Sequence, residues 1–262
     1  MWTSIEQWGK WMAGHSKWAN IKYRKERQDK KRSNLFGKLI KEIVLQARSG
    51  DPNPENNPGL AQALERARAA NLPKDNIDRA IKRATGELEG ISYEEATYEG
   101  YASDGVAVLV RVVTDNRNRA SAGVRHILSK HGGNMASAGS VAWLFDRKGI
   151  VVFGDLPEDV NRDELEMALI EAGADDIDDQ GNTIEATCEP SALPDLSDAA
   201  RGQGVTPIRA EVTMIPKNTV HVDGGSAEKV LKLIDALDEN EDVQEVFANF
   251  DVDDEVLERL NA

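Results

Sequence analysis

The spacing of apolar residues along the chain changes close to residue 90. Up to that point they recur every three or four positions, which predicts amphipathic helices. Three helices are expected, and their start signals are Ser33, Asn57 with Pro58, and Pro73. The first ends at Gly50 and the third at Gly86. Because three short amphipathic helices can bury one another's apolar faces, we expect a small all-α domain here.

Beyond residue 90, some segments are rich in β-branched residues and alternate between apolar and polar positions. Segments with helical spacing lie between them. Strands are expected at 98–101, 106–114, 141–145, 149–153, 183–188, 208–214 and 243–249. Helices are expected at 116–130, 162–172, 193–201 and 227–238. The strands at 141–145 and 149–153 would form a hairpin across Asp146-Arg147-Lys148. Since no repeat of parallel strands with long crossovers is visible, the pattern predicts an α+β fold class.

The strands are unevenly distributed between two parts of this region. Segment 137–205 has enough elements to close on itself. Segment 91–136 is short of strands unless 206–250 returns to complete its sheet. The hydrophobic pattern alone leaves this question open.

Charge divides the chain at nearly the same place as the hydrophobic pattern. The formal net charge is -14, yet residues 1–90 carry 18 Lys or Arg and 11 Asp or Glu. Residues 91–262 carry 14 basic and 35 acidic residues. A basic N-terminal part on an acidic protein is typical of a domain that faces a polyanion while the other domains stay away from it. The alternative is an acidic protein with one basic helix and no such role.

The basic charge is concentrated in residues 12–32, MAGHSKWANIKYRKERQDKKR, which we call the basic arm. Candidate phosphate contacts are Lys17, Lys22, Arg24, Lys25, Arg27, Lys30, Lys31 and Arg32. Candidate base contacts are Trp18, Asn20, Tyr23 and Gln28. If five to eight of these Lys and Arg side chains engage phosphates, the slope of log affinity against log salt concentration is roughly -5 to -7. Alternatively, Trp18 and Ile21 anchor the arm to the helical domain.

Further basic candidates lie outside the arm. Lys38 is on the first predicted helix, and Arg117 and Arg119 open the helix at 116–130. A helix N-terminus favours anions, so this start could bind a phosphate. The alternative is that Asp115 or Asn116 is an ordinary N-cap and the two arginines are solvated.

Five segments, in this order, resemble the YebC/PmpR family of bacterial proteins. They are MAGHSKWANIKYRKERQDKKR followed by LFGKLIKEI, NLPKDNIDRAIKRATGE (71–87), TDNRNRASAGVRHILSKHGGNM (114–135), GSVAWLFDRKG (139–149) and VQEVFANFD (243–251). Tyr23 departs from the family pattern, which has a His there. The family is known as probable transcriptional regulators and is similar to mitochondrial translational activators of cytochrome oxidase subunit I.

The resemblance implies a domain organisation. An N-terminal three-helix all-α domain would precede two small ferredoxin-like α+β domains, the middle one discontinuous. On this chain the expected parts are an extension at 1–11, the arm and helical domain at 12–90, a discontinuous domain at 91–136 with 206–262, and an inserted domain at 137–205.

Sequence signals of catalysis, metal binding and membrane insertion are missing. The four histidines have no Cys, Asp or Glu at metal or triad spacing, and no P-loop, dinucleotide-binding or nucleophile-elbow motif occurs. There is one cysteine, no run of about 18 apolar residues and no secretory signal. We therefore expect a cytoplasmic protein that is not an enzyme and has no cofactor, metal or membrane partner.

Together these features predict a non-enzymatic, nucleic-acid-binding regulator of gene expression. The resemblance implies two roles. The first is a DNA-binding transcriptional regulator, which we keep as the leading hypothesis, and the alternative is a translation factor that binds ribosomal or transfer RNA on the ribosome and relieves stalls such as those at proline runs. Aromatic residues inside the arm favour RNA as the target, because proteins stack aromatic side chains on unpaired bases more often in single-stranded RNA than in duplex DNA. A third possibility is an acidic scaffold that binds proteins; the oligomeric state stays open.

Overall fold

The computed structural model describes residues 29–154, 156–157, 160–179, 181, 183–253 and 256, with side chains from Ser33 onward. Among these residues Trp143–Thr219 form one compact unit, which we call the inserted unit. The residues on either side of it form the other unit. That second unit contains a helical bundle and an α+β part, which we call the middle domain.

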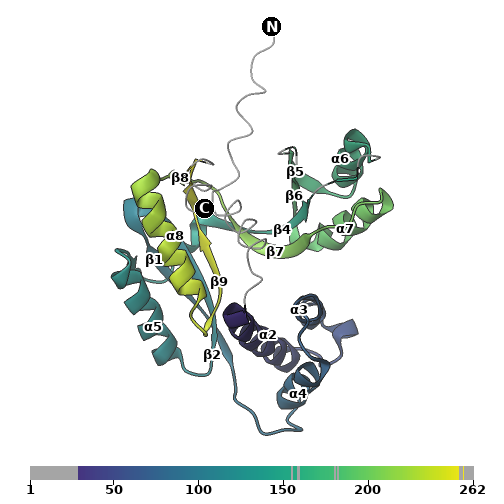
Figure 1. Cartoon of the computed structure of the whole chain (residues 1–262). Helices are drawn as coiled ribbons and strands as arrows, with labels where there is room; N and C mark the ends of the chain where they lie inside the picture. Colours follow the sequence, from purple (N-terminus) through teal and green to yellow (C-terminus); the bar gives the residue numbers. More distant parts are fainter. Residues whose placement is uncertain are drawn as a thin grey trace. The chain divides into compact units, whose positions relative to one another are not determined.

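The helical bundle consists of α2 (Asp29–Ser49), α3 (Pro58–Ala69) and α4 (Lys74–Ala84) (Figure 1). Its core is formed by apolar residues at helical spacing, among them Ile43, Leu60 and Ala80, all fully buried. The predicted N-terminus of the first helix needs correction. Ser33 lies inside α2 rather than at its start, because the preceding Lys and Arg residues have good helix propensity and no breaker separates them from it.

Asn57 caps α3 as predicted and also fixes the end of α2. Its side-chain oxygen accepts a hydrogen bond from the Leu60 N–H at 3.0 Å. Its amide nitrogen donates to the carbonyl oxygens of Gln46 at 2.8 Å and Asp51 at 2.9 Å. One buried side chain therefore joins two helices and the turn between them.

The middle domain is a four-stranded antiparallel sheet with the order β3-β1-β2-β9. Its strands are β1 (Glu94–Tyr101), β2 (Ala107–Thr114), β3 (Asn134–Met135) and β9 (Val243–Ala248). Helices α5 (Arg117–Lys130) and α8 (Gly224–Asp238) pack side by side and against the sheet (Figure 1). Alternate residues of β2 enter this core, and β9 closes the sheet from more than a hundred positions away.

A short parallel pair accompanies this sheet. It is formed by β8 (Val220–His221) and β10 (Phe250–Asp251). Phe250 is fully buried in the core of the middle domain.

The inserted unit has the order of elements β-α-β-β-α-β. The elements are β4 (Phe145–Phe153), α6 (Arg162–Glu171), β5 (Ala174–Asp179), β6 (Ile184–Cys188), α7 (Leu193–Gly202) and β7 (Arg209–Pro216). Its antiparallel sheet has the order β5-β6-β4-β7, which is the ferredoxin-like arrangement. Phe153, Leu165 and Leu196 are fully buried in its core. The predicted α+β fold class, with an N-terminal helical region, is confirmed.

One domain assignment and one strand prediction need correction. The strand expected near 208–214 is confirmed as β7, but it pairs with β4 from Arg209 to Pro216 in the inserted unit, whereas we assigned it with 206–262 to the discontinuous domain. Consecutive elements usually lie close together, and the short connection from α7 brings β7 to the sheet that α7 already covers.

The second error is the hairpin expected across Asp146-Arg147-Lys148. These residues lie within a single strand, β4, and all three pair with β7. They include neither glycine nor proline, so nothing local forces a turn once a partner strand is present. Val141 precedes a short 3₁₀ turn at Ala142–Leu144 instead of starting a strand.

The further 3₁₀ turns are Pro54–Asn56, Ser103–Gly105 and Pro190–Ala192. Within the described part of the chain, no helix has the length and apolar character to span a membrane.

Candidate nucleic-acid interface

Most of the predicted arm lies outside the described residues. This holds for Lys17, Trp18, Asn20, Lys22, Tyr23, Arg24, Lys25 and Arg27. Lys30, Lys31 and Arg32 belong to the first turns of α2, so the end of the arm is helical. The position of these three residues is therefore set by whatever holds α2.

Lys38 binds α2 to the end of α8. Its Nζ donates to the Asp238 carbonyl oxygen at 2.7 Å and to the Asp238 carboxylate at 3.1 Å. The side chain of Asn34 donates to the Glu239 carbonyl oxygen at 2.9 Å. Acidic residues at a helix C-terminus oppose the helix dipole, and a lysine at that end offsets the effect. The charged group of Lys38, a predicted phosphate contact, is thus occupied by an acidic partner.

Asp242 is the second anchor point of α2. It is 3% exposed and lies 2.8 Å from the Lys41 Nζ and 3.0 Å from an Arg119 guanidinium nitrogen. Arg119 also bonds Asp115 at 2.7 Å, and this hydrogen bond lowers the pKa of Asp115 below its ordinary value. Arg119, too, is engaged with acids, although it was predicted to contact phosphate.

Arg117 occupies a different setting from Arg119. The Asn116 side chain caps α5 by accepting the Arg119 N–H at 3.0 Å, as the sequence suggested. Arg117 is 60% exposed, and its guanidinium lies 3.6 Å from Glu94. It remains open to solvent at the start of the helix.

Arg111 of β2, which is not among the residues predicted from the sequence, joins the bundle to the sheet. Its Nη2 donates to both carboxylate oxygens of Glu42 of α2, at 2.9 and 3.0 Å, and its Nε donates to Glu95 at 2.6 Å. Burial by itself would raise the pKa of Glu42, but the charge and hydrogen bonds of Arg111 outweigh it and hold that pKa below its ordinary value. The same partners raise the pKa of Arg111. A lone Arg in the apolar strand AVLVRVVT was the available signal.

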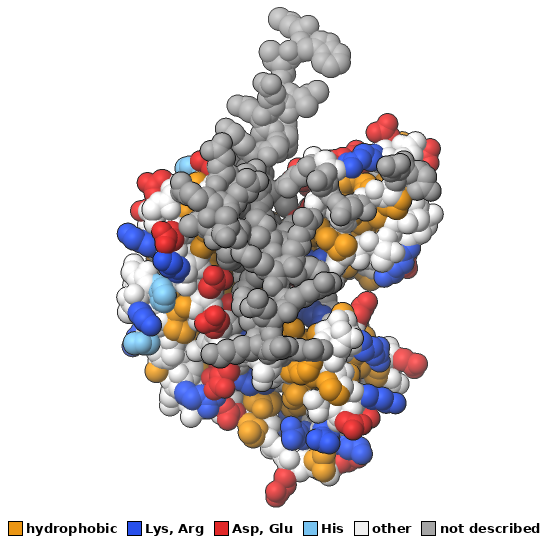
Figure 2. All heavy atoms as spheres, viewed as in Figure 1, with side chains coloured by type: hydrophobic (Ala, Val, Ile, Leu, Met, Phe, Trp, Pro, Cys, Tyr) orange, Lys and Arg blue, Asp and Glu red, His pale blue; other side chains and the backbone are white. Residues whose placement is uncertain are grey.

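These contacts sort the basic residues of the bundle into two groups. Lys38, Lys41 and Arg66 face acids of the middle domain, the last through Glu245 at 3.6 Å. The exposed basic residues for which the described part records no ion pair are Arg48, Arg68, Lys74, Arg79, Lys82 and Arg83. Figure 2 shows basic side chains mixed with acidic and apolar ones over α3 and α4.

Comparison with known proteins decides the family. A family model described as the TACO1/YebC protein N-terminal domain matches residues 16–87. A second, described as the TACO1/YebC second and third domain, matches residues 93–250. The chain belongs to the TACO1/YebC family.

Relatives in the family match nearly the whole chain. A protein of Thermosipho melanesiensis is 53% identical over 96% of this chain and 98% of its own length. One of Dictyoglomus turgidum is 49% identical over 95% of this chain and 100% of its own length. Both are named "Probable transcriptional regulatory protein".

A solved structure supports the fold. It is a conserved hypothetical protein from Aquifex aeolicus, 45% identical, with a TM-score of 0.77. The match covers 87% of this chain and 94% of that one. The chain is thus a member of a family of regulatory proteins and has that family's fold.

Proposed function

We propose that this member of the TACO1/YebC family is a non-enzymatic, cytoplasmic regulator of gene expression that binds nucleic acid through its basic arm. The observation that carries the proposal is the segregation of charge, with eight Lys or Arg in residues 17–32 of a chain whose net charge is -14. A polyanion is attracted to that end and repelled by the rest. The names of the relatives agree with such a role.

The basic residues divide into contacts and positioning residues. The contacts are Lys17, Trp18, Asn20, Lys22, Tyr23, Arg24, Lys25, Arg27, Lys30, Lys31 and Arg32, with Arg117 as an accessory. Lys38 and Arg119 act as positioning residues, because acids of the middle domain engage their charged groups. They fix α2, and α2 fixes the base of the arm.

The leading target is duplex DNA in transcriptional regulation. The second candidate is RNA on the ribosome, favoured by Trp18 and Tyr23 within the arm, since aromatic rings stack on unpaired bases. A protein-binding scaffold would not need the arm at all. The three functions therefore differ in what the arm does.

Neutralising the arm tests the proposal. The variant Lys22→Gln/Arg24→Gln/Lys25→Gln/Arg27→Gln removes four charges. Binding of duplex DNA and of single-stranded RNA is measured across a salt series. The slope of log affinity against log salt should fall in magnitude by roughly 3 to 4, because each lost phosphate contact removes about 0.7 to 0.9.

A matched control removes four charges elsewhere. Arg147→Gln/Arg201→Gln/Lys217→Gln/Lys232→Gln has the same net charge and should keep the slope of the unsubstituted protein. Equal slopes for the arm variant and the control would contradict the proposal. Co-sedimentation with ribosomes at near-physiological salt, without preference for any promoter DNA, would replace transcription by translation.

A further inference from the structure

Helix α5 is the unusual element of the acidic part of the chain. Its sequence, RNRASAGVRHILSK, contains four Lys or Arg and no Asp or Glu. Arg117 and Arg119 at its start face acids. Arg125 and Lys130 in its second half take part in no ion pair recorded for the described residues. Figure 2 shows Lys, Arg and His side chains gathered over the side of the molecule where α5 lies.

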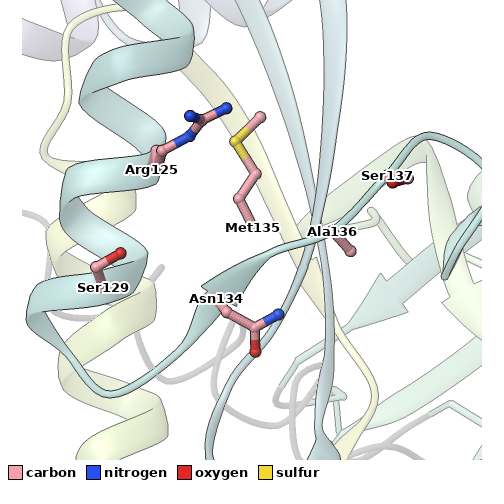
Figure 3. Close-up of a pocket in the computed structure, with 6 residues that line it drawn as sticks. All are labelled: Arg125, Ser129, Asn134, Met135, Ala136 and Ser137. Atoms are coloured by element: carbon pink, nitrogen blue, oxygen red, sulfur yellow. The ribbon is translucent and has the colours of Figure 1, made fainter.

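A groove lies beside this second half of α5. It has a volume of about 450 Å³ and is open to solvent. Its lining residues are Arg125, Ser129, Asn134, Met135, Ala136 and Ser137. In Figure 3 the Arg125 side chain extends from the helix toward Met135 of β3, while Ser129 lies one turn further along the helix. The helix wall presents Arg125 and Ser129, and on the strand wall Met135 points toward the helix whereas Asn134 points away from it (Figure 3).

Backbone contacts fix both ends of the groove. Gly132 has a φ of +80°, and a Cβ on Gly133 would lie 2.6 Å from the Tyr101 carbonyl oxygen, so the turn into β3 needs glycine at both positions. Beyond β3 the Ala136 N–H donates to the Glu99 carbonyl oxygen at 2.8 Å. The backbone of the β3 wall is therefore fixed by contacts within the protein.

A purely structural role explains only part of this pattern. Cations in the last turn of a helix stabilise its dipole, which accounts for Lys130. Arg125 lies more than a turn from the end, is exposed, and is directed over the groove (Figure 3). The Arg125 guanidinium, which has no ion pair recorded among the described residues, and the Ser129 hydroxyl on the same helix are donors suited to phosphate oxygens.

We propose that this groove binds one nucleotide of a nucleic-acid strand. Arg125 and Ser129 on the helix wall hold the phosphodiester, and the attached sugar or base lies against Met135 on the strand wall. The volume falls within the range of about 300 to 1,000 Å³ in which proteins bind small organic ligands, well beyond a bare phosphate. The inference rests on the proposed function, to which it adds a second contact, on the middle domain.

The test removes one charge from the groove. Arg125→Gln is compared with Arg201→Gln, an exposed arginine of α7 with the same change in net charge. The probes are a labelled single-stranded RNA of about 16 nucleotides and the DNA of the same sequence, each titrated across a salt series. Thermal unfolding verifies that both variants fold.

Arg125→Gln should bind about three- to tenfold more weakly than Arg201→Gln, with a salt slope smaller in magnitude by about 0.7 to 1. Arg125→Lys should restore the slope. If Arg125→Gln weakens binding of both the RNA and the DNA probe, the groove recognises the phosphodiester. If it weakens binding of the RNA probe alone, the groove also recognises the ribose hydroxyl.

Two results overturn the inference in distinguishable ways. If Arg125→Gln matches Arg201→Gln on both probes while the arm variant loses affinity, the groove plays no part and the proposed function stands. If the unsubstituted protein binds neither probe nor duplex DNA, both proposals fail.

Discussion

At the scale of single residues, buried polar side chains determine the local geometry of the bundle. Asn57 is 8% exposed and makes three hydrogen bonds to the backbone, using its oxygen for α3 and its nitrogen for the end of α2. Only one of these roles was visible in the sequence. The N-cap depends on residues three positions away, whereas the bonds to Gln46 and Asp51 depend on how the turn folds back.

Replacing Asn57 should destabilise the bundle in two separable steps. Asn57→Ala removes the cap and leaves two carbonyl groups without their donor, so the free energy of unfolding should fall by about 1 to 3 kcal/mol. Asn57→Asp keeps an oxygen for the Leu60 N–H and should lose less. Urea unfolding monitored by circular dichroism measures both. Equal losses in the two variants would show that the cap contributes nothing.

At the scale of elements, the carboxylate of Glu99 ties β1 to the loop that follows β3. It is 6% exposed and accepts the N–H groups of Gly139 and Val141, each at 2.6 Å, and of Ala142 at 2.9 Å. Burial would raise the pKa of Glu99, but these three donors outweigh it and leave the pKa below its ordinary value. The loop between the groove and the inserted unit is thereby pinned to the sheet.

This arrangement predicts a pH dependence of stability. Because the folded pKa of Glu99 is lowered, its contribution is fully present above the ordinary value of 4.5 and is lost as the pH falls through the folded pKa. Glu99→Gln should reduce the free energy of unfolding by about 1 to 3 kcal/mol at neutral pH. The difference from the unsubstituted protein should shrink under acid conditions.

Urea unfolding over a pH series measures that difference. Glu94→Gln, an exposed neighbour on the same strand, is the matched control and should show almost no change at any pH. A loss in Glu99→Gln that is constant down to strongly acidic pH would rule out the carboxylate as its cause.

At the scale of the whole molecule, ion pairs join the helical bundle to the middle domain. Arg111 with Glu42 forms the most buried of them around an arginine, at 19% and 12% side-chain exposure. Such pairs cost desolvation, so they add little net stability compared with apolar contacts. What they contribute is a specific orientation of the bundle on the sheet, because any arrangement that separates the partners leaves a buried charge unpaired. They orient α2, and with it the base of the arm.

A double-mutant cycle tests this coupling. Arg111→Gln should lower the free energy of unfolding by about 2 to 4 kcal/mol, since Glu42 is left with its charge uncompensated. Arg111→Gln combined with Glu42→Gln should cost less than the sum of the two single changes, with a coupling of about 1 to 3 kcal/mol. Chemical unfolding of all four proteins provides the cycle. Strict additivity would mean that the contact does not join the two parts.

The sequence by itself determined the features that depend on near neighbours. The helices of the bundle and the Asn57 and Asn116 caps follow from residues three or four positions apart. The α+β class follows from the mixture of helix-like and strand-like periodicity along the chain, which is also a local property. The segregation of charge, on which the proposed function rests, is likewise a property of composition.

Only the tertiary structure decided which distant segments meet. It assigned β7 to the inserted unit and β9 to the middle domain, although both strands alternate alike, because strand pairing depends on the sheet that each connection can reach. It also gave Lys38 an acidic partner 200 positions away and placed Arg125 over a groove. A basic residue looks the same in sequence whether it faces phosphate or carboxylate, and folding of the whole chain supplies the partner.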